Sequence, residues 1–231
     1  MTLTHNRKPD ESKTAVLAVN VGQPQALPGQ KREVMSGIVK HPISSPVFLS
    51  FTGMTGDGQA DLEHHGGPDK AVCVYDYSRY PALEQLMDRK LDWGACGENL
   101  TVEGCMEDEV RIGDVYELGE AKVQVSQPRK PCFKLGVRYD YKELPVYFQD
   151  SGHTGFYFRV LQEGEVTSAA IFRRISTDPT SMTILEANRI MHQGKHDAVG
   201  MRALLAIPTL ADSWKQTLLK RLAKLEPAEL D

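Results

Sequence analysis

Short apolar runs separated by glycine and proline fill the first two thirds of the chain, a pattern that is typical of β-strands joined by tight turns. Residues 14–22 predict a strand that ends at Gly22, and residues 36–43 and 47–51 form two further runs. Residues 71–77 predict a buried strand, because apolar side chains occupy most of its positions. This part of the chain is therefore expected to be mainly β.

Two longer segments predict β-hairpins. Residues 114–128 alternate between apolar and polar side chains with a period of two, with Val123 and Val125 on one face. Residues 155–175 contain two apolar runs on either side of the sequence Glu-Gly-Glu at 163–165, which predicts a second hairpin that turns there. Both segments therefore add antiparallel strands to the expected sheet.

Helical spacing is limited to short segments in this part of the chain. Residues 78–91 predict a helix, because Leu83 and Met87 repeat at four-residue spacing and Pro81 lies near the start. Residues 131–152, between the two hairpins, predict short helices. Many short strands with few long helices predict a β-barrel with helical decoration.

The composition changes after residues 176–181, where turn-forming residues cluster. Three runs with helical periodicity follow, at residues 183–193, 197–207 and 210–225. Thr183 and Glu186 have the spacing of a capping box at the start of the first run. We therefore predict a β-barrel domain over residues 1–179 and a three-helix domain over residues 180–231.

Composition narrows the class of protein. The 231 residues are 41% hydrophobic and carry a net charge of -4, so no global basic surface for nucleic acid is expected. No stretch is long and apolar enough to span a bilayer, and the polar first twelve residues lack the apolar centre of a signal peptide. These features predict a cytoplasmic protein.

The four cysteines are irregularly spaced and contain no CxxC pair, which argues against a zinc ribbon or a redox dithiol. In a reducing cytoplasm we expect free thiols. Cys73 lies inside an apolar run and is expected in the core, whereas acidic neighbours of Cys105 disfavour a thiolate. Cys96 is intermediate between these cases.

Cys132 has the most unusual setting of the four. The sequence "SQPRKPCFKLG" surrounds it with Arg129, Lys130 and Lys134, and neighbouring cations favour the thiolate, which is both a nucleophile and a metal ligand. The alternative interpretation is an incidental surface cysteine on the first turn of a helix that begins at Pro131.

The sequence "HHGGPDKAV" at residues 64–72 offers a second candidate site. Its two adjacent histidines would point to opposite sides of an extended backbone, so they are poor joint ligands for one metal. Gly66 and Gly67 permit close approach of the backbone to a ligand, and Asp69 and Lys70 supply an acceptor and a cation. This suits an anionic ligand, although a tight polar turn before a strand explains the same residues.

Three weaker motifs follow. Glu98 and Asn99 in "GACGENL" could hydrogen-bond the edge of a heterocycle, because an amide side chain both donates and accepts. The alternative interpretation is a turn with Asn99 near the start of a strand. His192 and His196 have the i,i+4 spacing of a helix without an HExxH motif, which argues against a metal site. Residues 56–61 are glycine-rich but lack the end of a P-loop, and we expect a loop.

The order of these motifs is more specific than any one of them. "GDGQAD", "HGGPDKAV", "GENLT", the Gly113–Asp114 pair and "SQPRKPCFKL" together resemble the MOSC domain, and within it the YiiM type. MOSC domains resemble the C-terminal domain of molybdenum cofactor sulfurases. The resemblance covers about residues 14–175, and the three C-terminal helices look like the 3-alpha domain that follows MOSC in YiiM-like proteins.

The resemblance implies a β-barrel that binds a molybdopterin-type molybdenum cofactor, with Cys132 as the protein ligand to the metal. It implies reduction of N-hydroxylated compounds, such as hydroxylaminopurines and other hydroxylamines, to amines in a detoxification reaction. The expected catalytic residues are Cys132, His65 and Glu98. His65 or Glu98 is expected to supply a proton. Only His65 of the histidine pair is carried over, since His64 lies outside the motif. The residues expected to bind the cofactor are Gly66, Gly67, Asp69, Lys70, Asn99, Gln127 and Arg129.

Further expectations concern partners and departures from the family. No GxGxxG motif is present, so electrons are expected from a separate reductase. The other expected partners are a small N-hydroxylated substrate and a second copy of the chain in a homodimer. Binding to a membrane or to nucleic acid is not expected. The family also implies an association with pyridoxal phosphate binding. Cys96 stands where many members have an aromatic residue, which leaves its role open.

Two alternatives belong to other functional classes. A sulfur carrier would hold a persulfide on Cys132, without molybdenum. A binding module without catalysis would hold the cofactor only, or would bind DNA through a helix-turn-helix with the basic face of "KQTLLKRLAK". Salt-dependent DNA binding by residues 180–231 would support the last of these.

Overall fold

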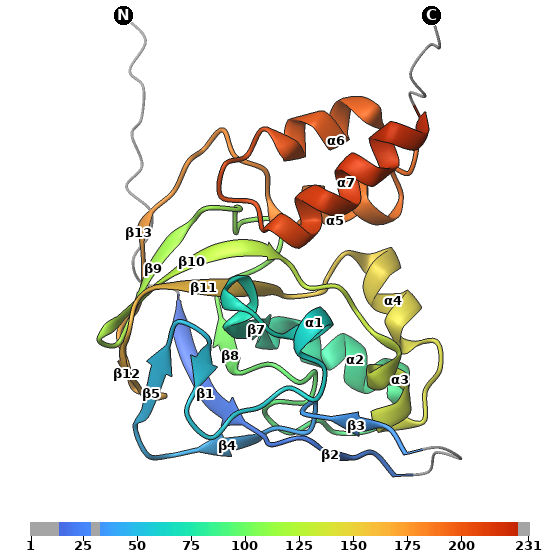
Figure 1. Ribbon diagram of the computed structural model, residues 1–231. Coiled ribbons are helices and arrows are strands. Elements are labelled where there is room, and N and C mark those ends of the chain that lie inside the picture. The colour runs from blue at the N-terminus through green and yellow to red at the C-terminus, as the bar shows by residue number, and fades with distance from the viewer. Residues whose placement is uncertain (1–13, 29–32, 226–231) are drawn as a thin grey trace, which may run out of the picture.

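An eight-stranded sheet organises the chain, with the strand order β13-β9-β10-β11-β7-β8-β1-β4 (Figure 1). The computed structural model describes residues 14–28 and 33–225, so the polar first twelve residues lie outside the described range. The strands of this sheet are β1 (Ala15–Val21), β4 (His41–Ile43), β7 (Val72–Asp76), β8 (Leu100–Glu103), β9 (Val115–Leu118), β10 (Ala121–Pro128), β11 (Phe156–Gln162) and β13 (Phe172–Ser176). Among the described residues, no helix combines the length and the apolar character that crossing a bilayer requires.

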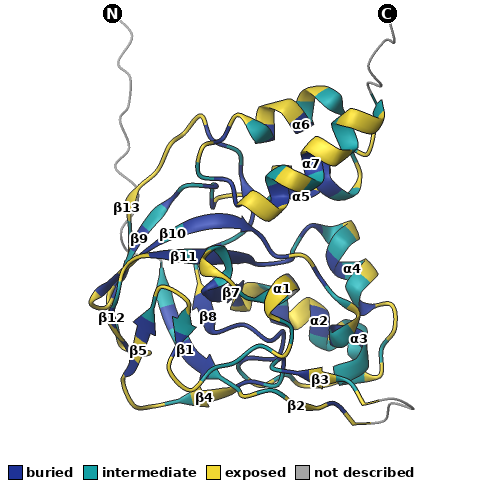
Figure 2. Ribbon diagram, in the orientation of Figure 1, coloured by how far each residue is buried: buried dark blue, intermediate teal, exposed yellow. Residues whose placement is uncertain are grey.

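Strand β7 lies in the middle of this sheet, and all five of its residues are buried. It pairs with β11 in antiparallel and with β8 in parallel orientation. A strand covered on both faces needs apolar side chains at consecutive positions, which explains the continuous run in the sequence. The buried strand predicted at residues 71–77 is confirmed, and Figure 2 shows β7, β8 and β10 largely in the dark blue of buried residues.

The sheet has two ends, β13 and β4, that do not pair with each other. The hydroxyl of Thr14, just before β1, donates to the carbonyl oxygen of Phe172 at 2.7 Å, so the sheet curves until β1 approaches β13. Hydrogen bonding between described strands does not close the sheet. A sheet-rich fold with helices is therefore observed, whereas the closed barrel expected from the resemblance is not confirmed.

The prediction of two hairpins was half right. β9 and β10 form the first hairpin and are paired in register. The segment at residues 155–175 does not form the second, because β10 and β7 occupy the two edges of β11 and leave no edge for a return strand. Instead β12 (Gly164–Val166) pairs with β5 (Val47–Ser50), and β13 pairs with β9.

The remaining strands are short. β5 and β12 form a three-stranded sheet with β6 (Gly53–Met54). β2 (Gln25–Ala26) and β3 (Met35–Ser36) form a two-stranded ribbon. The loop that follows β6 contains residues 56–61 without strand or helix until α1, as the glycine-rich sequence predicted.

Helices cover one side of the sheet, as Figure 1 shows. They are α1 (Leu62–His65), the 3-10 turns η1 (Pro68–Lys70) and η2 (Tyr77–Arg79), α2 (Tyr80–Met87), α3 (Phe133–Tyr139) and α4 (Leu144–Ser151). The helix and the short helices predicted at residues 78–91 and 131–152 are confirmed. Tyr80 and Leu83 of α2 pack in one apolar cluster with Leu135 of α3 and Phe148 of α4.

The last three helices are α5 (Ile184–His192), α6 (Ala198–Leu205) and α7 (Asp212–Leu225), drawn in orange and red in Figure 1. The capping box is confirmed, because the Thr183 side chain accepts from the Glu186 amide and the Glu186 carboxylate accepts from the Thr183 amide. Ile184, Trp214 and Leu218 belong to the same apolar cluster as the inward side chains of the sheet. The helices therefore pack directly on the sheet.

Candidate functional site

A cleft with two connected cavities opens where strand β10 ends. The inner cavity measures about 70 Å³ and the outer cavity about 330 Å³. Both are lined by His65, Lys70, Lys130, Cys132, Lys134 and Tyr157. The outer volume lies within the range of small-molecule sites, while the inner one suits a group of a few atoms.

Strand β10 and the turn after it deliver the central residues. Gln127 near the end of β10 lines the outer cavity, and Arg129, Lys130 and Cys132 follow directly. Cys132 has the extended conformation φ -121°, ψ 161° and is the residue before α3. All four cysteines are free, and Cys132 is the one that is not fully buried. The thiol of the sequence motif is thus presented to both cavities.

Arg129 is a buried cation of the cleft, with 6% of its surface exposed. Its Nη2 donates to the carbonyl oxygen of Cys96, and its backbone amide donates to the carbonyl oxygen of Gly155 at 3.0 Å. Its Nη1 is buried and has no hydrogen-bond partner among the described residues. A buried guanidinium group with an unpaired N–H, at the wall of a cavity, is a ready donor for an anion.

Lys40 and Asp57 contribute a part of the inner cavity that the sequence motifs did not indicate. The Lys40 ammonium forms a buried ion pair with Asp57 and lines the inner cavity. Asp57 also accepts from the Gly22 amide and from Nδ2 of Asn99, both at 2.9 Å. The loop at residues 56–61 therefore positions a cation, although it contains no recognisable ligand motif.

Positive charge dominates the lining. Among the described residues, Arg129, Lys130 and Lys134 form no ion pair, in contrast to Lys40. Burial lowers the pKa of Lys70, while the nearby Asp69 and Asp61 carboxylates act in the opposite direction. The excess of positive side chains around the cavities therefore disfavours a cationic ligand and favours an anionic one.

His65 lies at the junction of the two cavities. Burial lowers its pKa to about 4, and the charges of Lys134 and Arg129 add to the effect. The imidazole is therefore neutral at pH 7 in the ligand-free cleft. His65 lies in the short helix α1 and not in an extended segment, so the predicted backbone around the histidine pair was wrong. The side chain of His64 lies outside the described part of the structure.

Three predicted cofactor residues, Gly66, Gly67 and Asp69, line neither cavity. Asp69 forms an ion pair with Arg159 at 2.7 Å and accepts from the amide of Asp212 at 3.3 Å. Gly66 and Gly67 do not line either cavity, and a side chain at Gly67 would meet nothing within 4 Å. Its φ of 94° explains the glycine without a ligand.

Glu98 and Asn99 are buried with their polar atoms engaged. Glu98 accepts from the Tyr80 hydroxyl and, at 2.9 Å, from the Cys96 amide, and it does not line the cleft. Asn99 lines the inner cavity, but its Oδ1 accepts from the Cys73 amide at 3.0 Å. These residues hold the loop whose Cys96 carbonyl binds Arg129, and thus support the cleft from behind.

The other cysteines have different surroundings. Cys73 is buried as expected but also lines the inner cavity, and burial raises the pKa of its thiol. Burial also raises the pKa of Cys105, next to Asp76, and this thiol lies away from both cavities. Cys96 lies in the buried loop behind Arg129.

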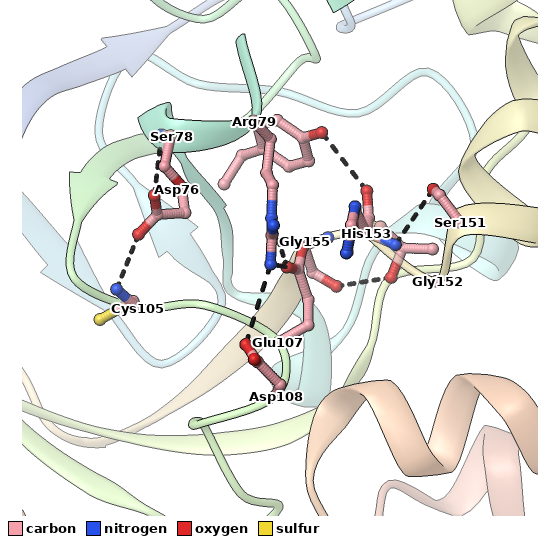
Figure 3. Close-up of polar contacts among 12 residues, drawn as sticks. Asp76, Ser78, Arg79, Cys105, Glu107, Asp108, Ser151, Gly152, His153 and Gly155 are labelled. Atoms are coloured by element: carbon pink, nitrogen blue, oxygen red, sulfur yellow. Dashed lines mark hydrogen bonds and ion pairs between the residues drawn. The ribbon is translucent and has the colours of Figure 1, made fainter. Parts of the chain in front are cut away.

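A polar network around Glu107 is linked to the cleft through Gly155, and Figure 3 shows its contacts. The Glu107 carboxylate accepts from Nε of Arg79 at 3.1 Å and from the Gly155 amide at 3.0 Å. The carbonyl oxygen of Gly155 accepts in turn from the Arg129 amide. The ion pair between Arg79 and the buried Glu107 thus helps to fix the backbone that carries Arg129.

Two family models match the chain. The MOSC domain model matches residues 61–169, and the model described as the YiiM-like, 3-alpha helix domain matches residues 182–225. Several residues that line the inner cavity precede the first matched range, namely Ser36, Gly37, Ile38, Lys40, Gly58, Gln59 and Ala60. The matched segments otherwise include Cys132, Arg129 and His65.

Similar proteins cover nearly the whole chain. YflK of Bacillus subtilis (strain 168) is 43% identical over 95% of this chain and 99% of its own. Protein YiiM of Escherichia coli (strain K12) is 34% identical over 88% of this chain and 90% of its own. The crystal structure of YiiM from Geobacillus stearothermophilus matches with a TM-score of 0.78 and 35% identity, over 91% of this chain and 100% of that one.

A protein named reductase, from Gibberella moniliformis (strain M3125 / FGSC 7600), is also similar. It is 34% identical over 69% of this chain, and the match covers 29% of the length of that protein. The similarity therefore concerns one part of a longer protein, and its name applies to the whole of it.

Proposed function

The chain belongs to the MOSC family and carries the YiiM-like 3-alpha helix domain, and from this we propose an oxidoreductase that binds a molybdenum cofactor. The proposed reaction is the reduction of N-hydroxylated compounds, including hydroxylaminopurines and other hydroxylamines, to amines. The similarity to a protein named reductase supports this class of reaction. The observation that carries the proposal is a partly exposed thiol, Cys132, in one cleft with Nη1 of Arg129, which has no hydrogen-bond partner among the described residues.

The residues of the cleft fit an anionic, sulfur-containing metal cofactor. The Cys132 thiolate is a soft ligand for the metal. Nη1 of Arg129, buried and unpaired among the described residues, suits a phosphate or a similar anion, and Lys70, Lys130 and Lys134 would balance further negative charge. We assign Cys132 as the protein ligand, because it matches the cysteine that the resemblance to the MOSC family implies and because it lines both cavities.

When bound, the cofactor supplies the two-electron chemistry of R–NHOH + 2 e⁻ + 2 H⁺ → R–NH₂ + H₂O. Cys132 anchors the metal, and the cations orient the anionic part of the cofactor. His65, at the junction of the cavities, is the residue we assign to hold a proton close to the leaving oxygen. Because its pKa is about 4 in the ligand-free cleft, protonation there depends on an anion that offsets Lys134 and Arg129.

The geometry changes the role that we propose for Glu98. It is buried behind the cleft and bonded to Tyr80 and to the Cys96 amide. We therefore propose that Glu98 positions the loop that holds Arg129 and does not deliver a proton itself. Asn99 has a similar role, because it links Asp57 to the backbone of Cys73.

The partners remain part of the proposal. A separate reductase supplies the electrons, and the substrate is a small N-hydroxylated molecule. Homodimer formation and pyridoxal phosphate binding stay predictions. Arg221, on the basic face of α7 that suggested DNA binding, donates to the carbonyl oxygen of Met191, so this cation has a structural partner.

Metal analysis of Cys132→Ser tests the proposal. Wild-type protein from cells that make the cofactor should contain molybdenum and reduce a hydroxylamine with a supplied reductant. Cys132→Ser should lose both, because an alcohol does not replace a thiolate as a soft ligand. The control is Cys105→Ser, whose thiol lies outside the cleft. Full activity in Cys132→Ser would reject the proposal, and sulfide release from molybdenum-free wild type would favour the sulfur carrier.

A further inference from the structure

An exposed aromatic ring borders the outer cavity beside Cys132. Phe133, the first residue of α3, is 61% exposed and lines the outer but not the inner cavity. Later residues of α3, such as Leu135, face the core. Phe133 therefore adds nothing to the apolar core of the protein, and it lies at the border of the outer cavity next to Cys132.

A buried amide lies on the same cavity. Gln127 is 2% exposed and lines the outer cavity. Its Oε1 accepts from the hydroxyl of Ser213 at 3.0 Å, and its Nε2 donates to the carbonyl oxygen of Pro128 at 3.2 Å. An amide has two N–H groups and two lone pairs, so one donor and one acceptor remain for a ligand. Because both ends are held, the amide keeps one orientation.

The combination of these two side chains indicates the kind of molecule that fits. A phenyl ring stacks with any flat π-system, and an oriented amide hydrogen-bonds the edge of a nitrogen heterocycle. Lys70, Lys130 and Lys134 line both cavities, whereas Lys40 and Arg129 line the inner cavity alone. The inner cavity therefore has the stronger positive charge and suits the anionic part of a cofactor. The outer cavity, with about 330 Å³, is large enough for a small ring system.

We propose that the outer cavity is the substrate subsite, that Phe133 stacks on a planar N-hydroxylated heterocycle, and that Gln127 binds its edge. This inference rests on the proposed function, and it specifies that aromatic bases are preferred over small aliphatic hydroxylamines. Phe133 and Gln127 are specificity-determining residues of the cleft, and this assigns to the substrate a glutamine that the family resemblance assigned to the cofactor.

The test compares Phe133→Leu with Phe48→Leu in the cofactor-loaded protein. Phe48 is 46% exposed on β5 and lines neither cavity, so it is a matched exposed phenylalanine. Adenine, the amine product of 6-hydroxylaminopurine, is titrated by calorimetry, which requires no turnover. We expect adenine binding to weaken about tenfold in Phe133→Leu, as for the loss of one aromatic–base stack. Phe48→Leu should bind adenine like the wild type.

A kinetic comparison completes the test. The ratio of kcat/KM for 6-hydroxylaminopurine to that for methylhydroxylamine should fall about tenfold in Phe133→Leu. Equal adenine affinity in wild type and Phe133→Leu, or an unchanged ratio, would overturn the inference. If wild type reduces neither compound but binds adenine through Phe133, the subsite stands and the proposed function fails, so the two failures are distinguishable.

Discussion

At the scale of single residues, Arg129 is a buried cation. Among the described residues, no carboxylate forms an ion pair with it, and its Nη1 has no hydrogen-bond partner. Such a group destabilises the ligand-free fold, because its charge loses hydration and one N–H finds no acceptor. Proteins retain such groups where ligand binding compensates for the loss of stability. Arg138, in contrast, uses Nη1 to donate to the carbonyl oxygens of Ile38 at 2.6 Å and Gly94 at 2.9 Å.

The first prediction contrasts these two arginines. Arg129→Met should lower molybdenum occupancy. It should lower the free energy of unfolding of the cofactor-free protein less than Arg138→Met does, because the lost bond to the Cys96 carbonyl is offset by the removal of a buried charge with an unpaired Nη1. Arg138→Met should lower the free energy of unfolding by about 1–3 kcal/mol, because two carbonyl groups lose their donor. Metal analysis and urea denaturation measure the two quantities. Normal occupancy in Arg129→Met would remove the guanidinium group from the cofactor site.

The second prediction concerns the charge state of His65. Its pKa in the folded protein is about 4, below the ordinary 6.5, so the unfolded chain binds more protons between these values. The free energy of unfolding should therefore fall as the pH is lowered from 6.5 towards 4. Lys134→Gln should raise the pKa, because Lys134 is the strongest charge that acts against protonation.

Proton NMR of the imidazole ring measures this pKa directly. Lys122→Gln is the control, since this exposed lysine of β10 lines neither cavity. A midpoint near 6.5 in the cofactor-free wild type, or an equal midpoint in Lys134→Gln, would contradict the electrostatic account of the cleft.

At the scale of elements, the start of α7 is fastened to the strand that leads into the cleft. The amide of Ala211 donates to the carbonyl oxygen of Ser126, and Ser213 binds Gln127. Asp69, next to Lys70, accepts from the amide of Asp212. The C-terminal helices therefore reach the wall of the outer cavity through one helix end.

The third prediction tests this link. Ser213→Ala should weaken adenine binding about threefold, because one hydrogen bond that orients Gln127 is lost. Thr217→Ala is the control, since its hydroxyl donates at 2.9 Å to the carbonyl oxygen of Ser213 within α7 and does not reach the cleft. If both variants bind adenine equally well, α7 does not influence the cavity.

At the scale of the whole molecule, sheet and C-terminal helices share one apolar core. Ile184, Met201, Leu204 and Leu218 belong to the same cluster as the sheet. An isolated backbone bridge joins Arg111 to Thr183. A shared core predicts one cooperative unfolding transition, whereas two independent domains would unfold separately.

The fourth prediction follows from this shared core. The chain has two tryptophans, Trp93 before β8 and Trp214 in α7, so 5-fluorotryptophan gives one ¹⁹F signal from each part. Both signals should leave the native state at the same urea concentration. Leu218→Ala should lower the free energy of unfolding by about 2–5 kcal/mol and should therefore lower the urea midpoint of both signals. Leu219→Ala, at an exposed position, should change the midpoint little. Two separate transitions would show that the two parts fold independently.

The sequence by itself determined the local elements and the central motif. Continuous apolar runs, period-two alternation and the Thr183–Glu186 spacing report local burial and local hydrogen bonding, so β7, the β9–β10 hairpin and the start of α5 were predictable. The cations around Cys132 were also readable, because they are neighbours in the chain. These features depend on contacts over a few residues.

Only the tertiary structure decided which side chains meet in the cleft. The Lys40–Asp57 pair joins two loops, Asp69 turns to Arg159 on β11, and Glu98 turns away from the cavities to Tyr80. The periodicity of a segment shows which face is buried but not which partner covers it, so the pairing of residues 155–175 was predicted wrongly. A polar group takes whichever partner the folded chain brings within hydrogen-bond distance. For Lys40, Glu98 and Asp69 that partner lies 17, 18 and 90 positions away in the sequence.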